Sequence, residues 1–371
     1  MSEWKKVKLG DFISLQRGYD LTKEQIVHGP YPVVSSTSIM GYHDSYKVKA
    51  PGVIIGRSGT LGEVQYVKTN YWPHNTSLFV KDFKGNEPLF VYYFLKNLGT
   101  DIAGGGAAIP TLNRNHLYVL DITTPSLTTQ KKIATVLSHY DFLIENYQKQ
   151  IKLLEEAAQR LYKEWFVDLH FPGHENTKII EGVPEGWEKK PISQLGEYLN
   201  GFAFKPSDWQ ESGKPIIKIK EMGNGVSNDT PRNNGERVPV KYLVKAGDLL
   251  FSWSATLMVI VWSGEEGWLN QHLFKVTPAK GIGREFLLQS ISNTIEEFQN
   301  LTTGSTMKHI QRNKLDQVFV NVPDDEIMTS YSDLAECMRN QILHLSSQIR
   351  LLTEARDRLL PKLMSGEIEI S

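Results

Sequence analysis

The sequence predicts an α+β fold of two tandem mixed α/β domains, each followed by a long helix. Two observations carry this prediction. The second half of the chain repeats the landmarks of the first half in order, and each half closes on an apolar period of about 3.5 residues. We expect a first domain at 1–126, a helix at 127–168, a linker at 169–186, a second domain at 187–324, and a second helix with its tail at 325–366.

The internal repeat is long and keeps one order. Residues 4–19 align without gaps on residues 187–202, with tryptophan, apolar and Gly-aromatic positions coinciding. The later matched pairs are 51–56 with 246–251, 75–79 with 270–274, 112–117 with 310–315, Pro125 with Pro323, and 150–157 with 348–355. A repeat of this length, unlike a short solenoid period, lets each copy hold its own core.

Each domain mixes short apolar runs with one helix-like stretch. The runs expected to form buried strands are 53–55 and 64–67 in the first copy, and 248–251 and 259–262 in the second. Residues 90–95 and 285–290 are expected to be helical. This mixture within each copy favours the α+β class.

A glycine-rich loop, residues 56–62, joins the first two predicted strands. Its glycines permit a tight turn that presents Arg57, Ser58 and Thr60. An arginine at a loop tip suits bidentate contact with guanine, and hydroxyls suit bases or phosphates. A plain hairpin turn explains the same residues equally well.

The second copy carries a different loop at this place, with Ser252, Trp253 and Ser254 and no arginine. The tryptophan could stack on a base or lie in the core. Matched strands with unlike loops are what a protein that reads two unlike DNA half-sites would need.

Small-residue segments precede the matched Arg-Asn pairs, at 104–110 and 302–309. They could let the backbone approach a phosphate, with Lys308 or Arg312 adding charge. A loop that packs each domain onto its helix is an equal alternative.

The long helices carry an apolar seam that steps four, three, four, three. Its central positions are Ile144, Ile151, Leu154 and Leu161 in the first copy, and Ile342, Ile349, Leu352 and Leu359 in the second. Arg356 alone breaks the seam, where it would snorkel or pair with a carboxylate. A pseudo-two-fold axis would pair the helices as an antiparallel coiled coil, whereas separate helices would each recruit an outside partner.

Composition excludes several classes of protein. Hydrophobic residues make up 40% and charged residues 22%, as in ordinary globular domains, and the formal charge of -1 gives no global positive field. No apolar run reaches the ~18 residues of a membrane span, so we expect a cytoplasmic protein with no membrane contact. We find no catalytic motif and no metal motif, and we interpret His170 and His174 as linker residues.

Three stretches of the chain resemble a known family: 187–192 (Trp-Glu-Lys-Lys-Pro-Ile), 247–254 (Gly-Asp-Leu-Leu-Phe-Ser-Trp-Ser) and 358–366 (Arg-Leu-Leu-Pro-Lys-Leu-Met-Ser-Gly). Together with the repeat, they are similar to the DNA specificity (S) subunit of type I restriction-modification systems. The resemblance covers essentially the whole chain.

The resemblance implies a non-catalytic subunit with two target-recognition domains that read the halves of a bipartite, asymmetric double-stranded DNA site. The paired helices would set the spacing and dock two adenine methyltransferase (M) subunits, while motor-endonuclease (R) subunits add restriction. We expect no cofactor in this chain and S-adenosylmethionine in the M subunits. Our candidate DNA contacts are Arg57, Ser58, Thr60, Ser252, Trp253, Ser254 and Lys308.

Two other classes of function remain as alternatives. One is a single-chain DNA methyltransferase with an unrecognised site, although the chain has no S-adenosylmethionine motif. The other is a coiled-coil scaffold that makes no contact with DNA.

Overall fold

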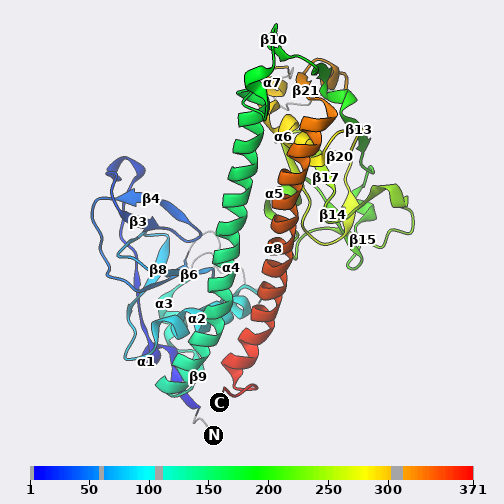
Figure 1. The fold of residues 1–371 in the computed structure, drawn as a ribbon. Helices are drawn as coiled ribbons and strands as arrows, with labels where there is room; N and C mark the ends of the chain where they lie inside the picture. The colour runs from blue at the N-terminus through cyan, green and yellow to red at the C-terminus, as the bar shows by residue number, and fades with distance from the viewer. Residues whose placement is uncertain (1–3, 58–61, 105–111, 302–311, 371) are drawn as a thin grey trace. The chain divides into compact units, whose positions relative to one another are not determined.

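A computed structural model describes residues 4–370 except 58–61, 105–111 and 302–311 (Figure 1). Its contacts divide the chain into two compact units. Unit 1 is Met1–Ile144 with Leu351–Ser371, and unit 2 is Glu145–Arg350. Each unit therefore contains one mixed domain and a stretch of both long helices.

Unit 1 is built on a four-stranded antiparallel sheet in the order β2-β8-β5-β6. The strands are β2 (Ser14–Arg17), β8 (Ser77–Asp82), β5 (Gly52–Gly56) and β6 (Val64–Val67). Helix α2 (Pro88–Gly104) contacts β5 and β6 and shares one apolar core with the sheet. Every residue of β5 is buried because this strand has a neighbour on each side and a helix on its face.

Two smaller sheets complete the domain of unit 1. One has the order β4-β3-β7, with β4 (Ile39–His43), β3 (Tyr31–Val34) and β7 (Trp72–Pro73). The other pairs β1 (Lys5–Lys8) with β9 (Asp121–Thr124). The short helices are α1 (Leu9–Phe12) and α3 (Arg114–Tyr118).

Unit 2 repeats this architecture. Its main sheet has the order β13-β20-β17-β18, formed by β13 (Gly196–Asn200), β20 (Leu273–Pro278), β17 (Leu249–Ser252) and β18 (Met258–Val261). Helix α6 (Arg284–Asn293) contacts β18 and β20, as α2 contacts its own sheet. The strands and helices predicted for both copies are therefore confirmed, and so is the α+β class.

The remaining elements of unit 2 are short. A second sheet, β15-β14-β19-β16, contains Arg232–Asn233, Lys214–Ile217, Gly267–Leu269 and Leu243–Val244 in that order. Two antiparallel pairs are β12 (Glu188–Pro191) with β21 (Phe319–Val322), and the hairpin β10 (Ile179–Ile180) with β11 (Val183–Pro184). The short helices are α5 (Ile219–Asn224) and α7 (Ile295–Asn300).

Two long helices follow the domains, as the periodicity predicts. α4 spans Leu127–Tyr162 and continues as a π-turn at Lys163–Val167, while α8 spans Asp325–Ser365. Asp324 caps α8, because its Oδ1 accepts from Ile327 N at 2.9 Å. Pro361 does not end α8, which runs on for one further turn. In the described part of the chain, no helix is long and apolar enough to span a membrane.

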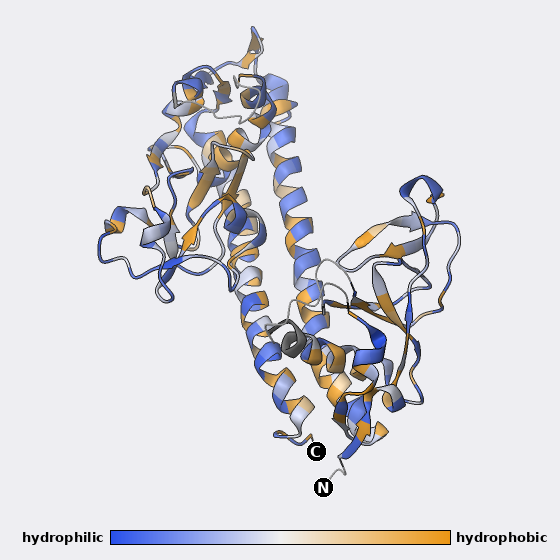
Figure 2. Ribbon diagram, turned by 180° about the vertical axis from the view of Figure 1, so that it is seen from behind, coloured by the Kyte–Doolittle hydropathy of each residue, from blue (hydrophilic) through white to orange (hydrophobic). Residues whose placement is uncertain are grey.

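Within each unit, α4 and α8 run antiparallel. In unit 1, Leu137 in the first part of α4 shares a core with Leu360 and Leu363 near the end of α8. In unit 2, Tyr162 at the end of α4 contacts Tyr331 near the start of α8, with ring centroids 6.3 Å apart. The helices thus bury their apolar faces on each other in both units, and they alternate blue and orange in Figure 2.

Burial along the helices follows the predicted seam. Ile144 and Ile342 are buried. The other six seam residues are half-buried: Ile151, Leu154, Leu161, Ile349, Leu352 and Leu359. Off the seam, Leu153 and Leu351 are 64% and 48% exposed, so the period separates inner from outer leucines at these positions, whereas the off-seam Leu360 near the end of α8 is buried in the core of unit 1.

Arg356, which interrupts the seam, pairs with a carboxylate of the facing helix. Its Nη1 lies 2.6 Å from Asp141 Oδ1 of α4. Tyr93 of α2 donates its hydroxyl to Asp141 Oδ2 at 2.5 Å. Burial raises the pKa of Tyr93, so its hydroxyl stays protonated and remains a donor. This network joins the domain of unit 1 to both long helices.

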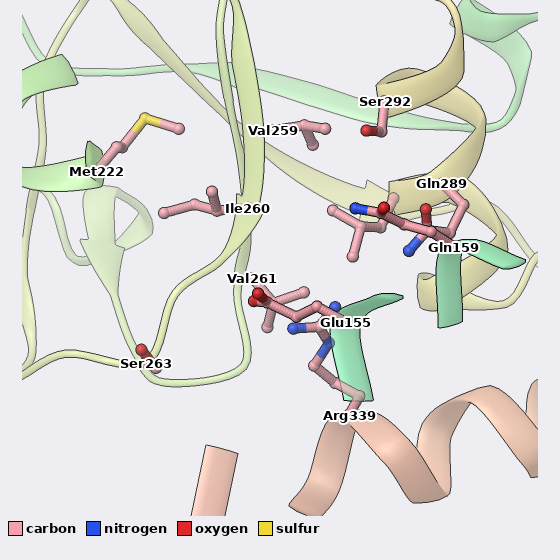
Figure 3. Close-up of a pocket in the computed structure, with 11 residues that line it drawn as sticks. Glu155, Gln159, Met222, Val259, Ile260, Val261, Ser263, Gln289, Ser292 and Arg339 are labelled. Carbon is pink, nitrogen blue, oxygen red and sulfur yellow. The ribbon is translucent and has the colours of Figure 1, made fainter. Parts of the chain in front are cut away.

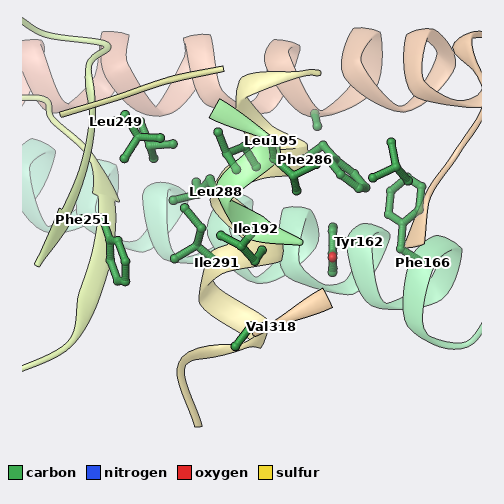
Figure 4. Close-up of a cluster of buried hydrophobic side chains, with 14 of the residues drawn as sticks. Tyr162, Phe166, Ile192, Leu195, Leu249, Phe251, Phe286, Leu288, Ile291 and Val318 are labelled. Carbon is green, nitrogen blue, oxygen red and sulfur yellow. The ribbon is translucent and has the colours of Figure 1, made fainter. Parts of the chain in front are cut away.

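The core of unit 2 gathers aromatic rings from three elements (Figure 4). The ring centroid of Phe166, in the π-helical turn after α4, lies 4.9 Å from that of Phe286 in α6. The ring centroid of Tyr162 lies 5.8 Å from that of Phe286. The Tyr162 hydroxyl is 3.0 Å from Ser290 Oγ. The domain of unit 2 is therefore packed directly on the ends of the long helices.

Candidate nucleic-acid interface

In unit 1, Arg57 stands directly after β5, at the start of the β5–β6 turn. Its N–H donates to Thr76 O at 3.0 Å, and its carbonyl accepts from Leu112 N at 2.9 Å. Gly56 N donates to Glu63 O and closes the turn. The backbone on both sides of Arg57 is thus fixed, while the side chain is half-buried. Ser58 and Thr60 lie outside the described residues.

Polar side chains lie around Thr76, whose carbonyl accepts from Arg57 N, and they were not predicted from the sequence. Ser36 Oγ donates to Thr76 O at 2.5 Å, and Gln65 Nε2 donates to Ser35 O at 2.8 Å. His74 Nδ1 lies 3.0 Å from Thr76 Oγ1. Thr76 belongs to a matched segment of the repeat, which was the available signal. Ser36 is buried and its hydroxyl, like the Gln65 amide, is hydrogen-bonded within the domain, so these two groups hold the turn in place, whereas His74 and Thr76 are half-buried.

In unit 2, Ser252 and Ser254 require a correction. Ser252 is fully buried, and its hydroxyl donates to Ser254 O at 3.1 Å and to Thr256 O at 2.7 Å. Ser254 is only 3% exposed. Ala255 has a φ of 57°, so the turn is tight. These two serines therefore form the β17–β18 turn and do not present their hydroxyls at the surface.

Trp253 lies half-buried at the same turn. Its Nε1 donates to Asn200 Oδ1 at 3.2 Å, and its ring centroid is 6.0 Å from that of Phe274. The exposed His272 lies 5.9 Å from the same ring, centroid to centroid. The tryptophan thus packs against the edge of the core and also borders exposed polar residues. Asn200 and His272 are neighbours that sequence analysis did not select.

The other predicted features concern Lys308, the two small-residue segments, the linker histidines and metal binding. Lys308 and most of the segments 104–110 and 302–309 lie outside the described residues, so their proposed phosphate contacts stay predictions. His170 pairs with Glu164, with 3.2 Å from Nδ1 to Oε1. Across the residues that the structure describes, no cluster of three or more His, Cys, Asp or Glu forms a metal site.

Two stretches of the chain, one in each copy of the repeat, match the same protein-family model. The model of the type I restriction modification DNA specificity domain matches residues 1–156 and again 184–341. This chain belongs to that family. The specificity subunits of the family are non-catalytic, and the resemblance drawn from the three sequence stretches is confirmed.

The specificity subunits similar to this chain include two from Methanocaldococcus jannaschii. The type I restriction enzyme MjaIX specificity subunit is 27% identical over 316 residues, which cover 79% of this chain and 72% of the relative. The MjaVIII specificity subunit is 22% identical over 399 aligned residues, which cover 99% and 93%. Both alignments extend across the two domains.

A solved specificity subunit has the same fold. The crystal structure of the type I restriction-modification S subunit from M. genitalium matches with a TM-score of 0.61 and 18% identity. The match covers 98% of this chain and 96% of that chain. At this identity the likeness establishes the architecture of domains and long helices, and it does not extend to individual DNA contacts.

Proposed function

We propose that this specificity subunit recognises a bipartite, asymmetric site in double-stranded DNA, with one half-site read by each domain. One observation carries the proposal: the two main sheets share one strand order, while the equivalent turns differ. The β5–β6 turn presents Arg57, and the β17–β18 turn presents Trp253. One scaffold with two different turns supports the reading of two different sequences.

The described residues supply suitable chemistry for base recognition. Arg57 can donate two hydrogen bonds to O6 and N7 of a guanine in the major groove. Trp253 offers one partly exposed ring for apolar contact, beside the amide of Asn200 and the imidazole of His272. Since the chain carries a formal charge of only -1, much of the phosphate contact would come from partner subunits.

The partners in this proposal are two DNA adenine methyltransferase (M) subunits and the motor-endonuclease (R) subunits. S-adenosylmethionine would be bound by the M subunits. The specificity subunit would position these enzymes on the DNA, and α4 and α8 would act as the spacer between its two domains. The absence of a recognisable S-adenosylmethionine motif supports this division of labour over a single-chain methyltransferase.

Footprinting of the complex between this chain and its M subunits tests the proposal. We expect two protected segments separated by an unprotected or weakly protected spacer, with different sequences in the two segments. Sequence-specific methylation by the M subunits without this chain would support the scaffold alternative. Binding of S-adenosylmethionine by the isolated chain would support the single-chain methyltransferase.

A further inference from the structure

Two arginine–glutamate pairs join α6 to α8 in unit 2. α6 begins with Arg284 and Glu285, and each pairs with a residue of opposite charge on α8. Arg339 donates through Nε and Nη2 to the two carboxylate oxygens of Glu285, at 2.8 and 3.1 Å. Arg284 donates through Nη2 to Glu336, and through Nη1 to Gly247 O at 3.0 Å.

These charges lie beside apolar contacts between the two helices, among them Phe286 of α6 and Tyr331 of α8, whose ring centroids are 6.4 Å apart. The side chains of Arg339 and Glu285 are 7% and 1% exposed, and those of Arg284 and Glu336 are 24% and 31% exposed. Burial of an ion pair is costly, and apolar residues of similar volume often stabilise such a contact at least as well. The pairs are therefore better explained by the geometry that they specify than by the stability that they add.

Arg339 also faces the other long helix. Figure 3 shows Arg339 directed from α8 toward Glu155 of α4, beside a hollow of about 300 Å³ that Gln289 also lines. Burial raises the pKa of Glu155, and the positive charge of Arg339 opposes this shift. The guanidinium thus lies between carboxyl groups of α6 and α4.

The order of the four charges favours the observed register between α6 and α8. A slip of three residues in one direction brings Arg284 opposite Arg339. The same slip in the other direction brings Glu285 opposite Glu336. Either slip breaks the buried Glu285–Arg339 pair and brings two like charges together, although the slip that faces Glu285 with Glu336 also places Arg284 opposite Asp333. Apolar contacts discriminate less between registers, because their stabilisation depends mainly on the area that is buried.

We propose that Arg284, Glu285, Glu336 and Arg339 are positioning residues that set the length of DNA spacer accepted by the complex. The inference rests on the proposed function, in which the long helices hold the domains at a fixed distance. One helical turn advances about 5.4 Å, and one base pair advances about 3.4 Å. A slip of one turn along α8 would therefore move the second domain by roughly one or two base pairs.

The test replaces the buried pair with apolar residues in the variant E285L/R339M. The complex with M subunits is assayed for methylation on duplexes that keep both half-sites and vary only the spacer length. We expect methylation at spacers one or two base pairs from the native length to rise at least about tenfold relative to wild type, which corresponds to about 1.4 kcal/mol. Base preference within each half-site should stay unchanged.

Two further variants make the result decisive. E354Q/R358Q removes an exposed i,i+4 pair from α8 and should keep the wild-type spacer profile. R284Q/E336Q removes the less buried pair. If E285L/R339M does not assemble, this variant tests the positioning role in its place. It should broaden the spacer profile in the same direction.

The outcomes separate this inference from the proposed function. An unchanged spacer profile in every assembled variant would overturn the positioning role and leave bipartite recognition intact. A wild-type complex that methylates without regard to half-sites would overturn the proposed function itself. A simple loss of rate at every spacer would also count against the positioning role, because it would show a purely structural effect.

Discussion

Arg57 combines a fixed backbone with a side chain near the surface. Hydrogen bonds to Thr76 and Leu112 hold its main chain on both sides. A preorganised arginine loses less conformational freedom when it binds a base than one on an untethered loop. Ser252 is a poor candidate for base contact, because its hydroxyl is already hydrogen-bonded within its own turn.

Replacement of Arg57 tests direct reading by unit 1. R57A should weaken recognition of the native site by about 1–3 kcal/mol, which lowers its methylation roughly five- to 150-fold, and should relax preference at one base pair of one half-site. The measurement compares methylation rates on duplexes substituted position by position. An equal loss on every duplex would instead identify Arg57 as a phosphate contact.

Asp141 tests the polar network that joins α2, α4 and α8 in unit 1. D141A removes the partner of Arg356 on α4, and the Arg356 side chain is only 14% exposed. The variant should therefore lower the free energy of unfolding by about 2 kcal/mol. D141L/R356L, which removes both charges, should recover only part of this loss, because the buried Tyr93 hydroxyl still lacks its acceptor. Chemical denaturation of the complex measures both variants. The exposed pair Lys152–Glu156 gives the control, since K152Q should change stability by less than about 0.5 kcal/mol.

At the scale of elements, the long helices were the most predictable part of the chain. Their period is carried by local sequence, and α4 begins at Leu127 and α8 at Asp325, where the two helices were expected to begin. The sheet β15-β14-β19-β16 was not predicted, because its strands have two to four residues and no alternating pattern. The α6–α8 ion pairs also escaped prediction, since they depend on which helices meet in three dimensions.

The candidate site was predicted less completely than the fold. The matched segments located the β5–β6 and β17–β18 turns, but a serine that closes its own turn has the same sequence signature as an exposed serine. Asn200 and His272 come from β13 and from the segment before β20, so only the folded sheet brings them to Trp253. Tertiary contacts therefore decide which polar residues of a turn remain available.

Insertion of one heptad into each long helix tests the helices as a spacer. Seven residues add about 10.5 Å, equivalent to roughly three base pairs, and keep the seam in phase. We expect a longer accepted spacer with unchanged half-sites, measured by methylation of the spacer series. An insertion of three residues into each helix is the control, because it breaks the seam and should reduce assembly.

At the scale of the whole molecule, two copies of one architecture with unlike turns would suit the asymmetric site that we propose. Each unit has its own core, so a domain should be exchangeable without loss of the other. The family model likewise matches twice, at residues 1–156 and 184–341, with one domain in each match.

Exchange of residues 1–126 for those of another specificity subunit tests this modularity. We expect a change in one half of the recognised site, with the other half and the spacer length unchanged. Methylation of a randomised duplex library reads out both halves together. A change in both halves would show that the two domains do not read independently.

Bipartite recognition is tested without any variant by adenine-methylation sequencing of the genome in cells that carry the complete system, with and without the gene for this chain. We expect one methylated motif of two unlike halves separated by a fixed spacer, and its loss when the gene is removed. Persistence of the same motif without this chain, or a motif that is continuous or palindromic, would contradict bipartite recognition by this subunit.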